Sequence, residues 1–232
     1  MKRIEVLDVW RSLAILMMVA YHLLYDLYLF GVISYEQLSH PLAFSLRLGA
    51  VGSFMLISGM VVRYSRNSLR RGAIVFCCGL LVSLVMGFMN MPVQFGVLHN
   101  LGFMMILYSL FTRIGGKMPK GIWFLVVCAL VFAVTYYVGQ NIFVETKLLV
   151  PLGLIYEEFY SADYYPLLPW GMLFAAGVWL GEKLEVTRDR FPLLQRKVRP
   201  MFTFMGRNSL IIYLAHQPLL YAICWSIWDR SF

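Results

Sequence analysis

Charged residues are scarce in this sequence. They make up 14% of its 232 residues, whereas a soluble domain carries about 25%. No Asp, Glu, Lys or Arg occurs in the 41 residues from 72 to 112, or in the 24 residues from 121 to 144. About 20 such residues are enough to cross a bilayer as a helix. This scarcity excludes a soluble enzyme and a disordered chain, and it predicts a polytopic membrane protein.

Cysteine is also sparse, with four residues that all fall within apolar runs. Cys77 and Cys78 are sequence neighbours, and none of the four has the spacing of metal ligands. A secreted domain stapled by disulfides is therefore excluded, and we expect no metal site. The thiols are interpreted as small packing residues.

The apolar runs predict an all-α fold, a bundle of about seven transmembrane helices that forms one domain over residues 1–232. The predicted spans are residues 7–30, 41–64, 72–89, 95–112, 121–140, 166–181 and 208–228. A further apolar stretch, residues 148–156, is too short to cross a bilayer. We expect it to lie on the outer surface or to fold back over a cavity.

The basic residues predict the orientation of the bundle. Sixteen of the 20 Lys and Arg residues fall in the N-terminus and in alternate loops. The positive-inside rule then places the N-terminus in the cytoplasm and the C-terminus outside. The net charge of +8 thus reflects topology, and no nucleic-acid partner is expected. We expect a multi-pass protein of the plasma or inner membrane, surrounded by lipid; a homodimer is compatible with the sequence.

Polar side chains within the predicted spans are the candidates for function. An ionisable group at the centre of a span costs about 2.5–3.5 kcal/mol, so such groups usually face the bundle interior or a wet cavity. The candidates are Arg11, His22, Asp26, Arg47, His99, Asn100, His216 and Gln217.

The first predicted span carries three of these candidates on one stripe. At 100° per residue, His22 lies about 20° and Asp26 about 60° from Arg11 around the helix. Asp26 follows His22 by four residues, which would allow the carboxylate to orient the imidazole as a general base. Arg11 would lie near the cytoplasmic end. The alternative is that His22 and Asp26 are satisfied by a neighbouring helix.

Other candidates come from different spans. Arg47 and His99 are expected at a depth similar to that of His22, although Arg47 could snorkel to the headgroups and His99 could make an interhelical hydrogen bond. His216 precedes Pro218, which frees the carbonyl of Leu214. That kink could line a cavity or could be a tolerated break. His40 lies in the first outer loop, where a histidine is usually incidental.

Five segments together resemble a known family. They are LDVWRSLAILMMVAYHLLYDL (residues 7–27), FMLISGM (54–60), FGVLHNLG (95–102), DYYPLLPWGMLFAAGVWLG (163–181) and GRNSLIIYLAHQPLL (206–220). They look like the catalytic domain of heparan-α-glucosaminide N-acetyltransferase and its small bacterial relatives, within the transmembrane acyltransferases.

The resemblance implies transfer of an acetyl group from cytoplasmic acetyl-CoA to an amine or hydroxyl of a glycan or amino sugar on the outer side. The bacterial pattern matches His22, Asp26, His99 and His216. In the lysosomal relative the histidine implicated in catalysis lies in the first luminal loop, where this chain has His40, and an asparagine stands at the position of His22. Either histidine could therefore be the base. Arg11 would bind CoA phosphates, and Arg47 or His99 would stabilise the oxyanion.

Outer-loop carboxylates, including Asp163, are expected to set the specificity for the acceptor. Two other functions use the same polar residues. A proton-coupled transporter or flippase would use the stripe of the first span as a proton path, but it predicts inverted repeats, and none is evident. A haem-binding electron carrier would use His22 and His99 as axial ligands.

Overall fold

The protein is all-helical in the computed structural model, which describes residues 4–187, 198 and 200–228. Seven long helices occupy the positions of the predicted spans. They are α1 (Glu5–Leu29), α3 (Pro41–Val62), α4 (Ser68–Phe88), α5 (Val97–Arg113), α6 (Trp123–Asn141), α7 (Leu167–Thr187) and α10 (Ser209–Trp228). Within the described ranges the only pairing of strand type is an isolated bridge between Phe143 and Ile155. The predicted all-α fold is confirmed.

Three short helices were not predicted: α2 (Tyr35–Leu38), η1 (Lys147–Leu152) and α9 (Pro200–Arg207). The η1 helix falls in the apolar stretch that is too short to cross a bilayer. It ends at Gly153, whose φ of 109° is a left-handed conformation that glycine adopts without steric cost.

Among the described residues, five helices are long and apolar enough to span a membrane: α1, α3, α4, α6 and α10. Their exposed side chains include Leu80, Leu84 and Leu130, each more than half accessible, as expected for surfaces that face lipid. By contrast, α5 has 17 residues and is about 25 Å long. The helix α7 contains a non-helical residue, Leu168. The number of seven spans and the orientation of the termini therefore stay predictions.

Contacts within the chain divide it into two compact units. Unit 1 is Met1–Phe54 with Arg188–Phe232, and unit 2 is Met55–Thr187. The helix α3 contributes residues 41–54 to unit 1 and 55–62 to unit 2. The prediction of one domain over the whole chain stays a prediction.

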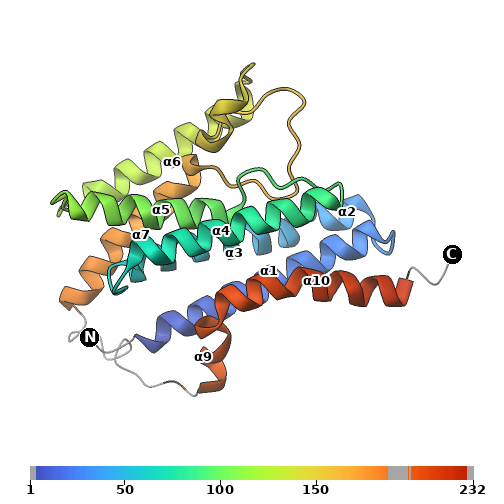
Figure 1. Cartoon of the computed structure of the whole chain (residues 1–232), viewed down its shortest axis with the longest axis horizontal. Coiled ribbons are helices and arrows are strands. Elements are labelled where there is room, and N and C mark those ends of the chain that lie inside the picture. The colour runs from blue at the N-terminus through green and yellow to red at the C-terminus, as the bar shows by residue number, and fades with distance from the viewer. Residues whose placement is uncertain (1–3, 188–197, 199, 229–232) are drawn as a thin grey trace. The chain divides into compact units, whose positions relative to one another are not determined.

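In unit 1, the first and last long helices, α1 and α10, lie side by side and run in the same direction (Figure 1). Contacts along the pair advance together: Ser12 bonds to Gly206 just before α10, the ring of His22 meets that of His216, and further along Phe30 meets Tyr221. An apolar core of Ala14, Ile15, Met18, Ala50 and Phe54 joins α1 to this part of α3.

In unit 2, glycines let the helices approach backbone to backbone. A Cβ on Gly59 of α3 would meet the carbonyl oxygen of Phe174, and one on Gly177 of α7 would meet that of Leu56. On the other side of the unit, Gly72 of α4 packs in the same way against Gly102 of α5. Small residues at such crossings are typical of helix packing in membranes, where close contact replaces the hydrophobic driving force.

Candidate functional site

Four polar side chains of unit 1 meet between α1 and α10: His22 and Asp26 from α1, and His216 and Gln217 from α10. We refer to them as the histidine cluster. The imidazole rings of His22 and His216 are 4.7 Å apart between centroids and stand nearly perpendicular. The amide Nε2 of Gln217 donates a hydrogen bond of 2.7 Å to Oδ1 of Asp26. Asp26 is completely buried, and His216 is 8% exposed.

The backbone fixes the tautomer of both imidazoles. Nδ1 of His22 lies 2.9 Å from the carbonyl oxygen of Met18, and Nδ1 of His216 lies 2.6 Å from that of Tyr213. A carbonyl oxygen can only accept, so Nδ1 is the protonated nitrogen of each ring. In a neutral ring the lone pair is then on Nε2, which is the arrangement that a general base needs.

Three atoms of the histidine cluster are buried without a hydrogen-bond partner among the described residues: Oδ2 of Asp26, Nε2 of His216 and Oε1 of Gln217. Buried polar atoms are almost always paired, because an unpaired one costs about 1–3 kcal/mol. All three open atoms are hydrogen-bond acceptors. The cluster therefore has the chemistry of a binding site for a group that donates hydrogen bonds.

The predicted orientation of His22 by Asp26 is wrong. His22 bonds to the carbonyl four residues before it, and Asp26 accepts from Gln217 instead. Side chains on a helix lean toward its N-terminus, so the ring of His22 reaches back to Met18. The alternative holds in part, because a neighbouring helix supplies a donor to one oxygen of Asp26, whereas His22 bonds to its own helix.

The other candidate base, His40, is exposed and directly precedes α3. Its Nδ1 accepts a hydrogen bond of 3.3 Å from the backbone N–H of Leu42. The imidazole thus covers a backbone donor in the first turn of α3, as N-cap side chains do. Its neutral ring carries the proton on Nε2, which is the opposite tautomer to that of His22.

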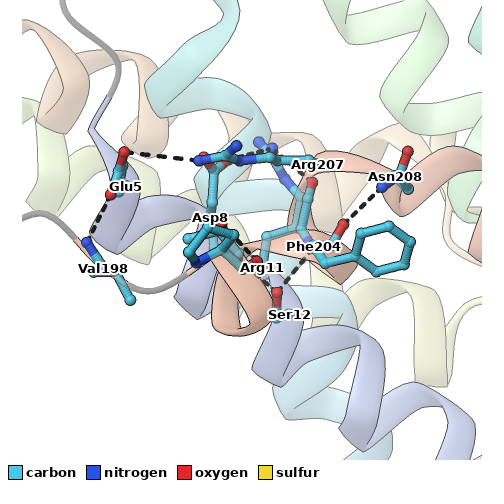
Figure 2. A network of polar contacts seen from close by, with 11 residues as sticks. Glu5, Asp8, Arg11, Ser12, Val198, Phe204, Arg207 and Asn208 are labelled. Atoms are coloured by element: carbon cyan, nitrogen blue, oxygen red, sulfur yellow. Dashed lines mark hydrogen bonds and ion pairs between the residues drawn. The ribbon is translucent and has the colours of Figure 1, made fainter.

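Arg11 lies in a second polar group of unit 1, which joins α1 to α9 (Figure 2). Arg11 is 7% exposed, and its guanidinium forms an ion pair with Asp8 and donates to the carbonyl of Gly206. Ser12 donates to the carbonyl of Asp8 and accepts from the N–H of Gly206. These contacts give Arg11 a role in holding the junction between α1 and α9.

Arg207 lies beside this junction and is 40% exposed at its side chain. It pairs with Glu5 and more distantly with Asp8. Arg47, the remaining cationic candidate of unit 1, is an exposed residue of α3.

His99 belongs to unit 2, where its surroundings are those of a packing residue. Ser83 donates its hydrogen to the carbonyl of Val93 and lies 3.5 Å from Nε2 of His99, so the hydroxyl oxygen accepts from that nitrogen. Nδ1 lies against Gly79 of α4, and a Cβ atom at that position would be only 3.0 Å from Nδ1. The ring is stacked on Phe95.

Asn100 and Asp163 fasten the loop before α7 to the start of α5. The buried amide of Asn100 donates to the carbonyls of Tyr165 and Pro166. Asp163 accepts from the N–H of Val97 in the first turn of α5. We call His99, Asn100 and Asp163 the loop-anchoring cluster. Its members meet backbone or hydroxyl partners, and one of its buried atoms, Oδ1 of Asn100, has no partner among the described residues.

The sequence reading missed the pairing of His22 with His216 and the role of Gln217. Gln217 was noticed as a polar residue in a span but was not placed in the site. The signal in the sequence was only that both residues are polar within apolar helices. In the described part of the chain, three His, Cys, Asp or Glu side chains nowhere gather in a way that could hold a metal ion.

A helical membrane-type fold with a buried imidazole pair is compatible with an integral membrane enzyme. The comparison with families is specific: the family model described as "Heparan-alpha-glucosaminide N-acetyltransferase, catalytic" matches residues 3–218. The chain belongs to this family, and this makes it an acetyltransferase-type membrane enzyme. No curated protein matches the chain, and no solved structure does.

Proposed function

We propose that this protein transfers an acetyl group from acetyl-CoA to an amine or hydroxyl of a glycan or amino sugar, with the histidine cluster as the reaction site. The observation that carries the proposal is the pair of imidazoles whose Nδ1–H groups are both held by backbone carbonyls. Their Nε2 lone pairs are left to accept a proton, and family membership supplies the reaction type.

In the reaction, the nitrogen or oxygen of the acceptor attacks the thioester carbonyl carbon and forms the new C–N or C–O bond. Nε2 of His22 accepts the proton that the acceptor loses. The tetrahedral intermediate then expels the CoA thiolate, which takes up a proton from the histidinium. The second imidazole, that of His216, lies beside the first with its own Nε2 open as an acceptor.

Acetyl-CoA approaches from the cytoplasm in this proposal, and the acceptor approaches from the outer side. The phosphates of CoA need accessible cations. We expect the basic loops of the cytoplasmic side to supply these cations, because Arg11 is buried in the junction with α9. In this proposal, carboxylates of the outer loops set the specificity for the acceptor. Lipid surrounds the bundle.

The test measures transfer of label from radioactive acetyl-CoA to a glycan mixture by purified protein. We expect His22→Ala to lower transfer by about 10²- to 10⁴-fold, the range for loss of a general base. His40→Ala is the matched control and should retain transfer, because that ring only covers the start of α3. Loss in His40→Ala with retention in His22→Ala would move the base to the outer loop.

A further inference from the structure

Two of the open atoms of the histidine cluster belong to Asp26 and Gln217 and not to the imidazoles. Asp26 is fully buried, yet only one of its carboxylate oxygens has a donor. Gln217 supplies that donor and leaves its own carbonyl oxygen buried without a partner. Both open oxygens belong to a single hydrogen-bonded pair, contributed by two helices.

We propose that Asp26 and Gln217 form the subsite that positions the acceptor, with Gln217 acting through Asp26. This inference rests on the proposed function and names residues that it leaves without a role. The ligand chemistry is a group that donates two or more hydrogen bonds from one atom or from neighbouring atoms. A primary amine and a pair of vicinal hydroxyls both meet that requirement.

The orientation of the Gln217 amide is determined by its partner. If the amide were reversed, its oxygen would face Oδ1 of Asp26, and two acceptors would lie 2.7 Å apart. The NH₂ group must therefore point to Asp26, and Oε1 stays open. Each carboxylate oxygen thus has its own role: Oδ1 is held by Gln217 and Oδ2 is left for the ligand.

His216 connects this pair to the chemistry. It is adjacent to Gln217 in the chain, and its open Nε2 is a third acceptor. A donor group bound by Asp26, which Gln217 holds in place, would leave its remaining hydrogen for an imidazole. Pro218, the next residue, has no N–H, so the carbonyl of Leu214 also loses its usual helical donor. No open donor accompanies these acceptors within the cluster.

The experiment measures steady-state kinetics with glucosamine and methyl glucoside as acceptors, one bringing an amine and the other only hydroxyls. Asp26→Asn keeps the shape but replaces the open oxygen by an NH₂ donor. Gln217→Met removes both polar atoms at nearly constant volume. We expect the acceptor KM to rise about tenfold or more in Asp26→Asn and less in Gln217→Met, since a buried polar group left without a partner weakens binding. The KM for acetyl-CoA should not change.

The double variant separates positioning from a merely structural role. Because Gln217 acts through Asp26, the double variant should be no worse than Asp26→Asn alone. Asn208→Ala is the control. It removes an exposed hydrogen bond from the side-chain amide to the carbonyl of Phe204 in the same unit, and it should leave both KM values unchanged. Additive effects, or an equal rise in the KM for acetyl-CoA, would overturn the inference. If Asp26→Asn does not fold, Gln217→Met alone decides, through the two KM values.

Failure of the proposed function can be distinguished from failure of this inference. If the wild-type protein transfers acetyl to no acceptor, calorimetry of glucosamine and methyl glucoside binding tests the subsite by itself. Asp26→Asn should then weaken binding of whichever probe binds by about tenfold. Equal affinity in the wild type and Asp26→Asn, or no binding of either probe by the wild type, would overturn the inference.

Discussion

The histidine cluster of unit 1 and the loop-anchoring cluster of unit 2 are built from the same residue types, yet they use them differently. In unit 2, His99 meets a hydroxyl on one side and the backbone of α4 on the other. In unit 1, Nδ1 of His22 and Nδ1 of His216 each bond to a carbonyl of their own helix, and Nε2 of each ring is left to accept a proton. One cluster closes a loop onto a helix, and the other remains open to a ligand.

This difference shows that burial and residue type do not identify a site by themselves. His99 is 5% exposed and His216 is 8% exposed, so burial does not separate them. The two clusters differ in how many of their buried polar atoms lack a hydrogen-bond partner. Unit 1 leaves three open acceptors around one imidazole pair, whereas the loop-anchoring cluster leaves one. The comparison predicts that variants in the histidine cluster change activity and variants in the loop-anchoring cluster change stability.

The largest expected effect comes from replacing a histidine of each cluster by alanine. His216→Ala should lower acetyl transfer by about 10²- to 10⁴-fold, as for loss of an acid–base group, with little change in the thermal unfolding midpoint in detergent. His99→Ala should lower that midpoint and leave the turnover of folded protein nearly intact. An active-site role for His99 is established instead if its variant is stable and inactive.

The next effect is on the stability of unit 2. Asn100→Asp should destabilise the protein by about 2–4 kcal/mol, because it removes two hydrogen bonds and buries a carboxylate against the carbonyls of Tyr165 and Pro166. Asn100→Ala should cost less, since it introduces no charge. Thermal unfolding followed by circular dichroism measures both. Equal effects of the two variants would contradict this account of the anchor.

A smaller effect tests the junction of α1 with α9. The hydroxyl of Ser12 links the carbonyl of Asp8 to the N–H of Gly206. Ser12→Ala should cost about 1 kcal/mol of stability because it removes a buried hydrogen bond between α1 and α9. Ser226→Ala, whose hydroxyl is exposed and bonds within α10, is the control. A large loss of activity in Ser12→Ala at full stability would place this junction in the catalytic machinery.

The smallest effect concerns pH and the loop before α7. Tyr164 donates a hydrogen bond of 2.7 Å to the carbonyl of Val150, and burial raises the pKa of its phenol above the usual range. The folded protein therefore holds this proton more tightly than the unfolded chain does. The resulting stability is complete below about pH 10 and falls as the pH rises further. Tyr164→Phe should be slightly less stable at pH 8 and should lose less between pH 9.5 and 11.

The sequence predicted the long helices well because each is a long apolar run, and length and hydropathy are local properties. It missed α9, since eight residues between basic segments give no apolar run long enough to register. The spacing of His22 and Asp26 correctly placed both on one face of α1. Sequence spacing cannot show which helix packs against that face, so the pairing with α10 was not found.

The tautomer of His22 shows a second limit. A histidine in a helix has a carbonyl four residues before it and can have a carboxylate four residues after it. Periodicity treats both as neighbours, and the backward lean of helical side chains decides between them. For Arg11 the sequence correctly identified a buried cation on the polar stripe. Its partners, Asp8 and the carbonyl of Gly206, come from one nearby residue and one that is 195 positions away.

The histidine cluster joins the beginning of the chain to its end. Asp26 and Gln217 are 191 residues apart, and a ribosome adds about 5–20 residues per second. The first half of the cluster is therefore made about 10–40 s before the second. Until α10 is synthesised and inserted, the nascent protein has His22 and Asp26 but no complete cluster. If the cluster is the reaction site that we propose, the nascent protein cannot transfer acetyl groups before α10 is in place, and a chain terminated before His216 lacks both the second imidazole and Gln217.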